Sequence, residues 1–317
     1  MIFTRTIISR TGIRLLPLSL RNIVRPYWHR VKVRNDFRSA KKGLLNSGAL
    51  SREEKNWLKR VSLEIHPGDP MYVASGARHY LSVGLSARWC IDEALSRSCK
   101  NKSVRSILDF PCGYGRVLRF LKVSFPNAKI VGCEIDPMAV EFCKRVFSIK
   151  AIISDENLDT VSIPEQFDLI WCGSLVTHLD EKRTSKILRF FYEHLAPGGI
   201  CLITTHGRTS VEWMRSKPEA YVGLSASARQ KLLSEFHERG YGYADYESTV
   251  GYGISVVSQE RMAKLACNVG RWTESIFVEH GWDNHQDVHG FAKANQAMQE
   301  ICVPVRDFLG QKDARLR

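Results

Sequence analysis

Short apolar runs alternate with longer segments of helical periodicity between residues 104 and 205. Runs that are apolar at nearly every position predict strands buried on both faces. Five such runs follow one another, at residues 104–108, 129–133, 151–155, 167–172 and 200–205, and the third ends in the acid Asp155. Asp180, a residue type that caps helices, precedes one of the helical segments, and Pro197 ends it. Alternating strands and helices with short connections predict a doubly wound, mostly parallel sheet of the α/β class.

The segment before the first strand is predicted to be helical. Ser51 and Glu54 have the spacing of a capping box and begin an amphipathic helix with Trp57 on its apolar side. A turn is predicted at residues 66–70, and a second helix at residues 86–95. We therefore expect a helical extension on the N-terminal side of the sheet.

A glycine-bearing turn connects the first predicted strand to a helix that begins at Arg116. Strand, tight turn and helix N-terminus in this order form a nucleotide-binding cradle, because glycines let the backbone approach a ligand and the helix end offers unpaired N–H groups. Glu134 ends the second strand 19 positions after Gly115, a spacing that suits an acid binding a ribose diol. A dinucleotide-binding turn needs a third glycine where Leu118 stands, so a pyrophosphate site for NAD is disfavoured.

The run Asp-Phe-Pro-Cys-Gly-Tyr-Gly at residues 109–115 resembles the first signature of class I S-adenosyl-L-methionine (SAM)-dependent methyltransferases. That signature reads acid, any, Gly, any, Gly, any, Gly, and residues 131–134 are similar to the family's ribose-binding strand. The chain departs from the signature at Pro111, which replaces the first glycine. The resemblance extends over about residues 70–295 and is strongest over residues 104–205.

The resemblance implies a Rossmann-like seven-stranded sheet, parallel except for one antiparallel strand near the C-terminus. A closing hairpin over residues 275–288 would supply that strand. The implied cofactor is SAM, whose ammonium group and lack of phosphate suit an acid ahead of the glycines. The resemblance also implies that the segment of Tyr80 and Gly84, which precedes the first strand, packs over the bound cofactor; simple packing is the alternative role of Tyr80. The predicted cofactor-binding residues are Asp109, Phe110, Gly113, Gly115, Glu134, Asp155, Tyr80, Gly84 and Gly173.

Two histidines are the candidate catalytic residues. Methyl transfer is an in-line displacement accelerated mainly by alignment of the reactants, and an oxygen acceptor also benefits from a base. His178 follows the fourth strand and His206 the fifth, so both are expected at the carboxyl edge of the sheet, where ligands bind. Each could instead be a helix cap or a hydrogen-bonding loop residue. Residues 283–287 include Asp283, His285 and Asp287, but hairpin packing explains this pattern equally well, and no metal is predicted.

The main clue to the methyl acceptor is a motif that this sequence lacks. The (Asn/Asp)-Pro-Pro-(Tyr/Phe) turn, found after the fourth strand in many enzymes that methylate exocyclic amino groups, is replaced by residues 172–175, Cys-Gly-Ser-Leu. An insertion at about residues 208–270 is rich in tyrosine, which suits stacking on sugars or flat small molecules but also suits ordinary hairpin packing. The pattern is similar to that of bacterial methyltransferases associated with glycan or glycolipid assembly. We expect methyl transfer to an oxygen of a glycan, glycolipid or small molecule. The alternatives are an RNA or protein methyltransferase and a non-catalytic SAM-binding scaffold.

Basic charge is concentrated at the N-terminus. Of the formal net charge of +13, residues 1–42 carry +10, from eleven Lys or Arg against one Asp, which leaves +3 for the remainder. Such an arm fits peripheral contact with anionic lipid, a targeting segment or a solvated extension. Gly12, Pro17 and Pro26 are expected to interrupt any long helix there. Because the remainder has little excess positive charge, nucleic acid is not the favoured partner.

The length of 317 residues allows one enlarged catalytic domain with an extension. We expect a basic arm at 1–50, a helical cap at 51–100, the methyltransferase domain at 101–300 and a tail at 301–317. The nine cysteines contain no C-x-x-C pair and fall partly in predicted strands, which indicates reduced thiols and a cytoplasmic location. Through its arm the protein could also lie at the inner membrane face. No apolar run reaches the roughly 18 residues needed to span a bilayer.

Overall fold

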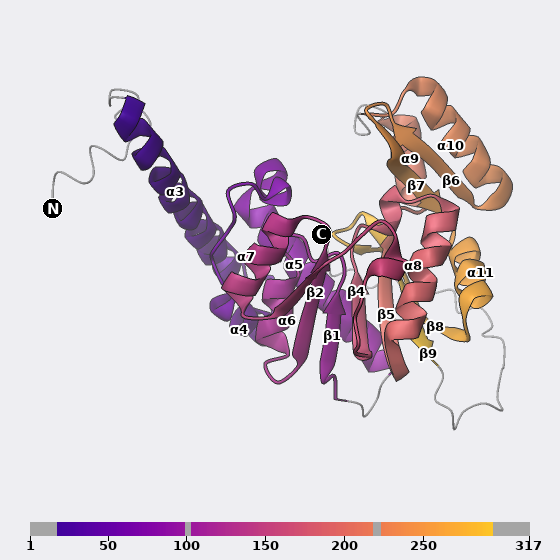
Figure 1. The fold of residues 1–317 in the computed structure, drawn as a ribbon, viewed down its shortest axis with the longest axis horizontal. Helices are drawn as coiled ribbons and strands as arrows, with labels where there is room; N and C mark the ends of the chain where they lie inside the picture. Colours follow the sequence, from indigo (N-terminus) through magenta and orange to yellow (C-terminus); the bar gives the residue numbers. More distant parts are fainter. Residues whose placement is uncertain (1–17, 99–102, 218–222, 294–317) are drawn as a thin grey trace.

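The computed structural model describes residues 18–98, 103–217 and 223–293. Its centre is a seven-stranded sheet with strand order β3-β2-β1-β4-β5-β9-β8 (Figure 1). The strands are β1 Ser106–Asp109, β2 Lys129–Glu134, β3 Lys150–Ile153, β4 Phe167–Cys172, β5 Leu195–Thr205, β8 Trp272–Trp282 and β9 Gln286–Lys293. Strand β9 pairs antiparallel with both of its neighbours, and the five strands from β3 to β5 are mutually parallel. The predicted doubly wound Rossmann-like sheet, with one antiparallel strand near the C-terminus, is confirmed.

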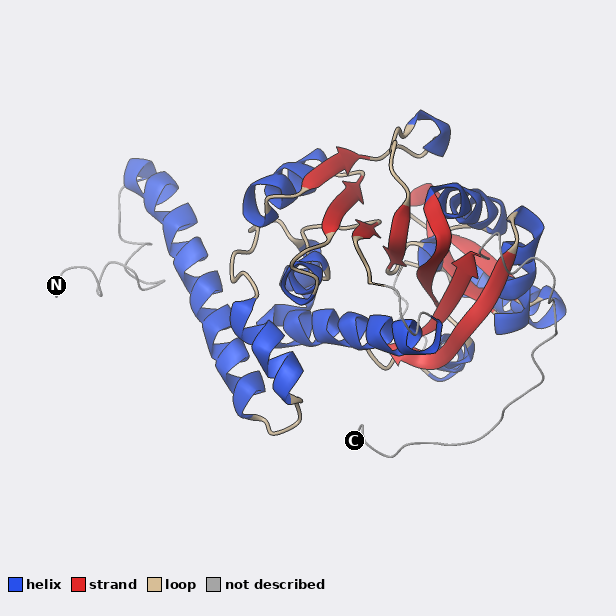
Figure 2. Ribbon diagram, turned by 90° about the horizontal axis from the view of Figure 1, so that it is seen from below, coloured by secondary structure: helices blue, strands red, loops and turns tan. Residues whose placement is uncertain are grey.

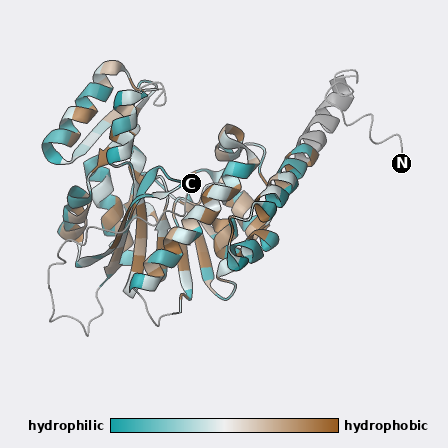
Figure 3. Cartoon of the chain, turned by 180° about the vertical axis from the view of Figure 1, so that it is seen from behind, coloured by the Kyte–Doolittle hydropathy of each residue, from teal (hydrophilic) through white to brown (hydrophobic). Residues whose placement is uncertain are grey.

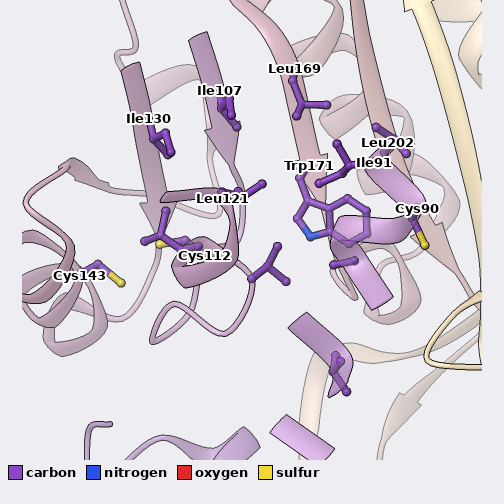
Figure 4. Packing of buried hydrophobic residues seen from close by; sticks show 14 of the residues in the cluster. Cys90, Ile91, Ile107, Cys112, Leu121, Ile130, Cys143, Leu169, Trp171 and Leu202 are labelled. Carbon is purple, nitrogen blue, oxygen red and sulfur yellow. The ribbon is translucent and has the colours of Figure 1, made fainter. Parts of the chain in front are cut away.

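Both faces of the sheet are covered, which explains why its strands are apolar at nearly every position. Every residue of β4 is buried. One face packs on helices α5, α6 and α7, and the other on α8 and α11 (Figure 2). Figure 4 shows the first of these layers, where Ile107, Leu169 and Trp171 of the strands meet Ile91 and Leu121 of the helices. Figure 3 shows the same distribution, with hydrophobic colour concentrated on the strands.

The helices begin and end close to the predicted positions. Helix α4 (Arg52–Arg60) starts with the expected capping box, and α8 (Glu181–His194) is capped by the Asp180 side chain. Helix α6 (Leu118–Ser124) starts two residues after the predicted Arg116, and α7 spans Pro137–Phe147. Helix α5 (Pro70–Ser98) is longer than predicted, with a break at Gly76, where φ is 73°. Short 3-10 turns occupy Leu158–Thr160 (η1) and Val176–His178 (η2).

Helix α3 (Leu18–Asn46) corrects one expectation, because it continues through Pro26 (Figures 1 and 2). Proline removes one helical hydrogen bond but does not forbid a helix that other contacts hold. Those contacts lie further along, where Phe37 and Leu44 are buried together with Trp57. The expected interruptions at Gly12 and Pro17 lie outside the described residues.

A buried arginine connects this helical layer to the sheet. Arg119 on α6 is 1% exposed. Its Nε donates to the Gly115 carbonyl at 3.0 Å and its Nη1 to the Ser62 carbonyl at 2.8 Å. The guanidinium carbon lies 5.8 Å from the Phe37 ring centre and 5.1 Å from that of Tyr80. Arg119 therefore bridges α3, α5 and the glycine turn after β1.

The insertion forms its own small lobe, drawn at the upper right of Figure 1. It consists of α9 (Arg208–Ser216), α10 (Ala226–Arg239) and a separate hairpin of β6 (Tyr241–Tyr246) and β7 (Thr249–Val257). Helix α11 (Gln259–Val269) then returns the chain to β8. The lobe has a core of its own, with Leu232 and Val256 both fully buried.

No helix in the described part of the chain combines the length and the apolar character needed to cross a membrane.

Candidate functional site

A cavity of about 910 Å³ lies at the carboxyl ends of the parallel strands. Its walls come from the turn after β1, the ends of β2 and β3, the loop after β4, one face of α8 and the near end of β7. Seven of the nine predicted cofactor residues line it: Tyr80, Asp109, Phe110, Gly113, Glu134, Asp155 and Gly173. The topology therefore brings residues separated by almost 100 positions to one sheet edge, as expected for a doubly wound fold.

The turn after β1 requires glycine at two positions. Gly113 and Gly115 have φ values of 49° and 80°, in the left-handed region that other residues rarely adopt. A Cβ built on Gly115 would also lie 2.3 Å from the Phe147 ring, so that glycine allows the turn to pack on α7. The bond between Phe110 and Pro111 is cis.

Glu134 holds this turn in place. One carboxylate oxygen accepts the Gly113 backbone N–H at 2.8 Å. The other accepts the N–H groups of Ile135 at 2.8 Å and Asp136 at 3.1 Å. The side chain is 8% exposed and lines the cavity. Because each carboxylate oxygen has two lone pairs and three of the four are used, Glu134 can accept one more hydrogen bond, from a hydroxyl of a bound ribose.

Asp109 is the most unusual group in the cavity. It is 1% exposed, and neither carboxylate oxygen has a hydrogen-bond partner within the described residues. Burial raises the pKa of this carboxyl well above its ordinary value, the Glu134 charge raises it further, and Arg116 opposes the shift. A buried carboxylate without a partner is costly, and a ligand cation would relieve that cost. The site therefore fits the ammonium group of SAM.

Three further predicted cofactor residues hold the cavity walls. The Tyr80 ring is fully buried and meets Phe37 edge to face at 5.6 Å, and burial raises its pKa. Phe110 lines the cavity and meets two aromatic rings of α8 edge to face. A Cβ on Gly173 would lie 2.9 Å from the Trp282 ring.

Asp155 and Gly84 stand in different surroundings. Asp155 lies two residues beyond the end of β3, where its Oδ1 accepts the backbone N–H of Asn157 at 2.7 Å. Gly84 lies inside α5, where an added Cβ would come within 2.3 Å of the Phe120 ring. The close approach of α5 and α6 at this point accounts for the glycine through packing.

His178 lies in the cavity wall with a defined tautomer. Its Nδ1 is 2.8 Å from the Gly253 carbonyl, which can only accept, so Nδ1 carries the proton and Nε2 the lone pair. Tyr252 stacks on the ring at 4.9 Å, and the Tyr246 hydroxyl lies 3.2 Å from Nδ1. Burial lowers the pKa of His178, partly opposed by the bond to Gly253. The imidazole is thus neutral at pH 7 and able to accept a proton.

His206 stands in a different environment. It is 6% exposed, its Nδ1 lies 3.2 Å from the Ser255 carbonyl, and its ring centre is 5.1 Å from that of His285. Burial, followed by the charges of His285 and His178, lowers the pKa of His206 to about 3. His206 does not line the cavity, whereas His178 does. Of the two candidate bases, only His178 can therefore reach a ligand there.

The acid and histidine cluster of the closing hairpin is held by packing contacts. Asp287 accepts the His280 backbone N–H at 3.0 Å, and the His285 ring stacks on Trp213 at 4.8 Å. Asp283 lies 3.2 Å from His79. Within the ranges that the structure describes, no group of three or more His, Cys, Asp or Glu side chains could hold a metal ion.

The buried state of His206 predicts a loss of stability in acid. The unfolded chain takes up a proton on this residue near its ordinary pKa of 6.5, and the folded chain only near 3. Stability is therefore complete above pH 6.5 and falls as the pH decreases toward 3. Urea unfolding at pH 7 and pH 5 should show that His206→Asn removes on the order of 1–2 kcal/mol of this decrease. An equal decrease in both proteins would contradict the buried neutral imidazole.

Some lining residues were not among the predicted site residues. Arg116 follows the glycine turn, and its guanidinium lies 5.4 Å over the Trp282 ring. Trp282 is fixed by a bond from its Nε1 to the Val83 carbonyl at 3.0 Å. Tyr252 belongs to the tyrosine-rich insertion and lies in β7. Its place in the cavity could not be predicted, because no signal in the sequence shows that β7 lies beside the sheet.

Comparisons with known proteins agree with the site. A family model described as "Methyltransferase domain" matches residues 108–201. The chain is 29% identical over 185 residues to "tRNA N(3)-methylcytidine methyltransferase Mettl2" of Drosophila melanogaster, covering 55% of this chain. The chain spans only about half of that relative's length, 51%.

Solved structures are similar at lower identity. An S-adenosylmethionine-dependent methyltransferase from Clostridium acetobutylicum is 13% identical with a TM-score of 0.46, over 66% of this chain and 91% of that one. The PH0226 protein from Pyrococcus horikoshii is 14% identical with a TM-score of 0.49, over 72% and 96%. The methyltransferase match covers the glycine turn and strands β2 to β4, the segments that carry the signature residues. Residues 108–201, which carry the signature residues, thus resemble a methyltransferase domain, and the cavity beside them has an unpartnered carboxylate that suits the cationic end of S-adenosylmethionine.

Proposed function

We propose that this protein transfers the methyl group of SAM to a hydroxyl oxygen of a small polar acceptor, such as a glycan or glycolipid unit. The observation that carries the proposal is His178, a neutral imidazole with its lone pair on Nε2, in the same cavity as Asp109 and Glu134. A base is useful when the acceptor is a hydroxyl, because the oxygen must lose its proton during the transfer.

The roles of the residues follow from their positions. Bound SAM supplies a methyl group on a sulfonium, ready for in-line displacement. Asp109 binds the ammonium group, Glu134 a ribose hydroxyl and Asp155 the adenine end. His178 accepts the acceptor proton at Nε2 while its Nδ1–H stays bonded to Gly253. The cavity brings the cofactor-binding residues and the base together, so that the acceptor and the methyl group can be aligned.

Tyr246 and Tyr252 support a sugar-like acceptor. Their rings lie 6.1 Å and 4.9 Å from that of His178, so aromatic faces and hydroxyls flank the proposed base. This combination suits the apolar face and the polar rim of a sugar ring. The test is S-adenosylhomocysteine release over a panel of neutral and acidic sugars, glycolipids and transfer RNA. Tight binding of NAD with none for SAM would overturn the proposal.

Glu134→Ala is expected to weaken SAM binding by about 10- to 150-fold, from the loss of 1.5–3 kcal/mol carried by a charged hydrogen-bond partner. The substitution also releases the backbone N–H of Gly113, so the turn loses a restraint. Calorimetric titration with SAM and S-adenosylhomocysteine measures the change. The exposed Glu141→Ala on α7 is the matched control and should bind normally. Unchanged affinity in Glu134→Ala would remove Glu134 from the cofactor site.

An RNA methyltransferase is the second candidate, favoured by the tRNA methyltransferase among the relatives and by the basic arm. Deleting residues 1–42 would be a poor test, because it removes the buried Phe37. Changing Arg34 and Arg38 of α3 to Gln removes basic charge at exposed positions and keeps Phe37 in place. Loss of transfer RNA binding would favour the RNA enzyme, and loss of binding to anionic liposomes a membrane arm. SAM binding without turnover over the whole panel would indicate a scaffold.

A further inference from the structure

We propose that the methyl acceptor carries a phosphate or carboxylate group, which Arg183 and Lys186 bind on the α8 wall of the cavity. This inference rests on the proposed function and names the substrate class of the same site. Both residues line the cavity and lie three positions apart on one helix, so they share a face. Ile187 is the third residue that α8 adds to the lining, and no acid of this helix joins them.

Charge is divided between the walls of the cavity. The carboxylates that line it at the ends of the first three strands are Asp109, Glu134, Asp136, Asp155 and Glu156. The sulfonium and ammonium groups make the cofactor cationic at these positions, so the acidic side suits SAM. The two cations of α8 repel those groups and suit a ligand of opposite charge. Arg116, the remaining basic lining residue, belongs to the cofactor turn and lies over Trp282.

Few acidic side chains neutralise the charges of Arg183 and Lys186. Arg183 pairs with Asp180, three positions before it, at 3.6 Å, and Asp180 also caps the helix. For the Lys186 ammonium group, no hydrogen bond or ion pair joins it to any residue that the structure describes, and the side chain is exposed. An arginine beside a lysine can bind a phosphate or carboxylate through charge-assisted hydrogen bonds.

Arg183 and the proposed base lie against the same strand, β7. The Arg183 guanidinium lies against the β7 backbone, where a Cβ built on Gly251 would be 2.6 Å from Nη2. His178 is bonded to Gly253 of the same strand. The base and the arginine therefore contact β7 at positions two residues apart. A monosaccharide with one acidic substituent can therefore contact both.

Calorimetry on the full chain saturated with S-adenosylhomocysteine tests the inference without requiring turnover. The probes are glucose 1-phosphate, glucuronate and glucose, which separate a phosphate from a carboxylate and both from a neutral sugar. The expected result is that at least one acidic sugar binds and that Arg183→Gln/Lys186→Gln weakens it by about tenfold or more. The control, Lys182→Gln/Arg189→Gln, removes the same charge from exposed positions of α8 outside the cavity and should bind like the wild type.

Three results would overturn the inference: no binding of either acidic sugar, equal weakening by both double variants, or glucose binding as tightly as the acidic sugars. Binding of a short single-stranded RNA that only Arg183→Gln/Lys186→Gln loses, with neither sugar bound, would replace the small molecule by nucleic acid. If the acidic sugar binds as expected but no acceptor of the panel is methylated, the proposed methyl transfer is wrong while the inferred binding site stands. Equal S-adenosylhomocysteine affinity in all three proteins shows that the variants are folded.

Discussion

His178→Asn is expected to lower kcat by about 10²–10⁴-fold, the usual contribution of a general base, without changing the affinity for SAM. Asparagine can keep the donor to the Gly253 carbonyl, so the loop stays in place while the basic nitrogen is lost. The pKa of His178 is lowered from 6.5, so the wild type should remain active somewhat below pH 6.5 and lose activity in stronger acid. The variant should lack this acid limb. Product formation followed across pH measures both effects.

His194→Asn is the matched control for this change. His194 also holds a backbone carbonyl through Nδ1, that of Phe190 at 2.8 Å, but it lies at the end of α8 outside the cavity. Its substitution should leave kcat within a factor of about two or three of the wild type, as removal of a residue without a catalytic role would. If His178→Asn lowered kcat by less than tenfold, alignment of the reactants alone would account for the methyl transfer. His178 would then only position the loop.

Phe37→Ala is expected to reduce the free energy of unfolding by about 3–5 kcal/mol, the cost of truncating a buried phenylalanine. The ring is fully buried and meets Tyr72 at 5.5 Å and Tyr80 at 5.6 Å. Chemical denaturation monitored by circular dichroism gives the change. Val250→Ala, at a side chain that is 96% exposed, should change the stability by less than about 0.5 kcal/mol. If Phe37→Ala behaved like Val250→Ala, α3 would not be part of the folded core.

The central sheet was predictable because its sequence signals are local. Strand β4 is buried along its whole length, and a strand covered on both faces must be apolar throughout. The glycine turn and Glu134 were also predictable, since positive φ and a shared cofactor restrict the residue types and their spacing. These signals depend on local backbone geometry, which restricts the residue types at neighbouring positions and can therefore be recognised in the sequence.

Features that depend on distant packing were harder to predict. Pro26 opposes a helix locally, and only the burial of Phe37 and Leu44 explains why α3 is long. His178 and His206 both follow strands, and the sequence does not reveal that only His178 faces the cavity. In both cases the deciding contacts come from segments far along the chain, as when β7 binds His178 through Gly253.

Arg119 limits how this protein can be recombined with its relatives. The side chain joins the Gly115 carbonyl of the cofactor turn, the Ser62 carbonyl and the rings of Phe37 and Tyr80. An N-terminal segment taken from another methyltransferase would leave this guanidinium buried among unmatched neighbours, and an uncompensated buried charge is strongly destabilising. The smallest unit that can be transplanted intact therefore begins within α3, upstream of Phe37, and continues through the glycine turn to α6.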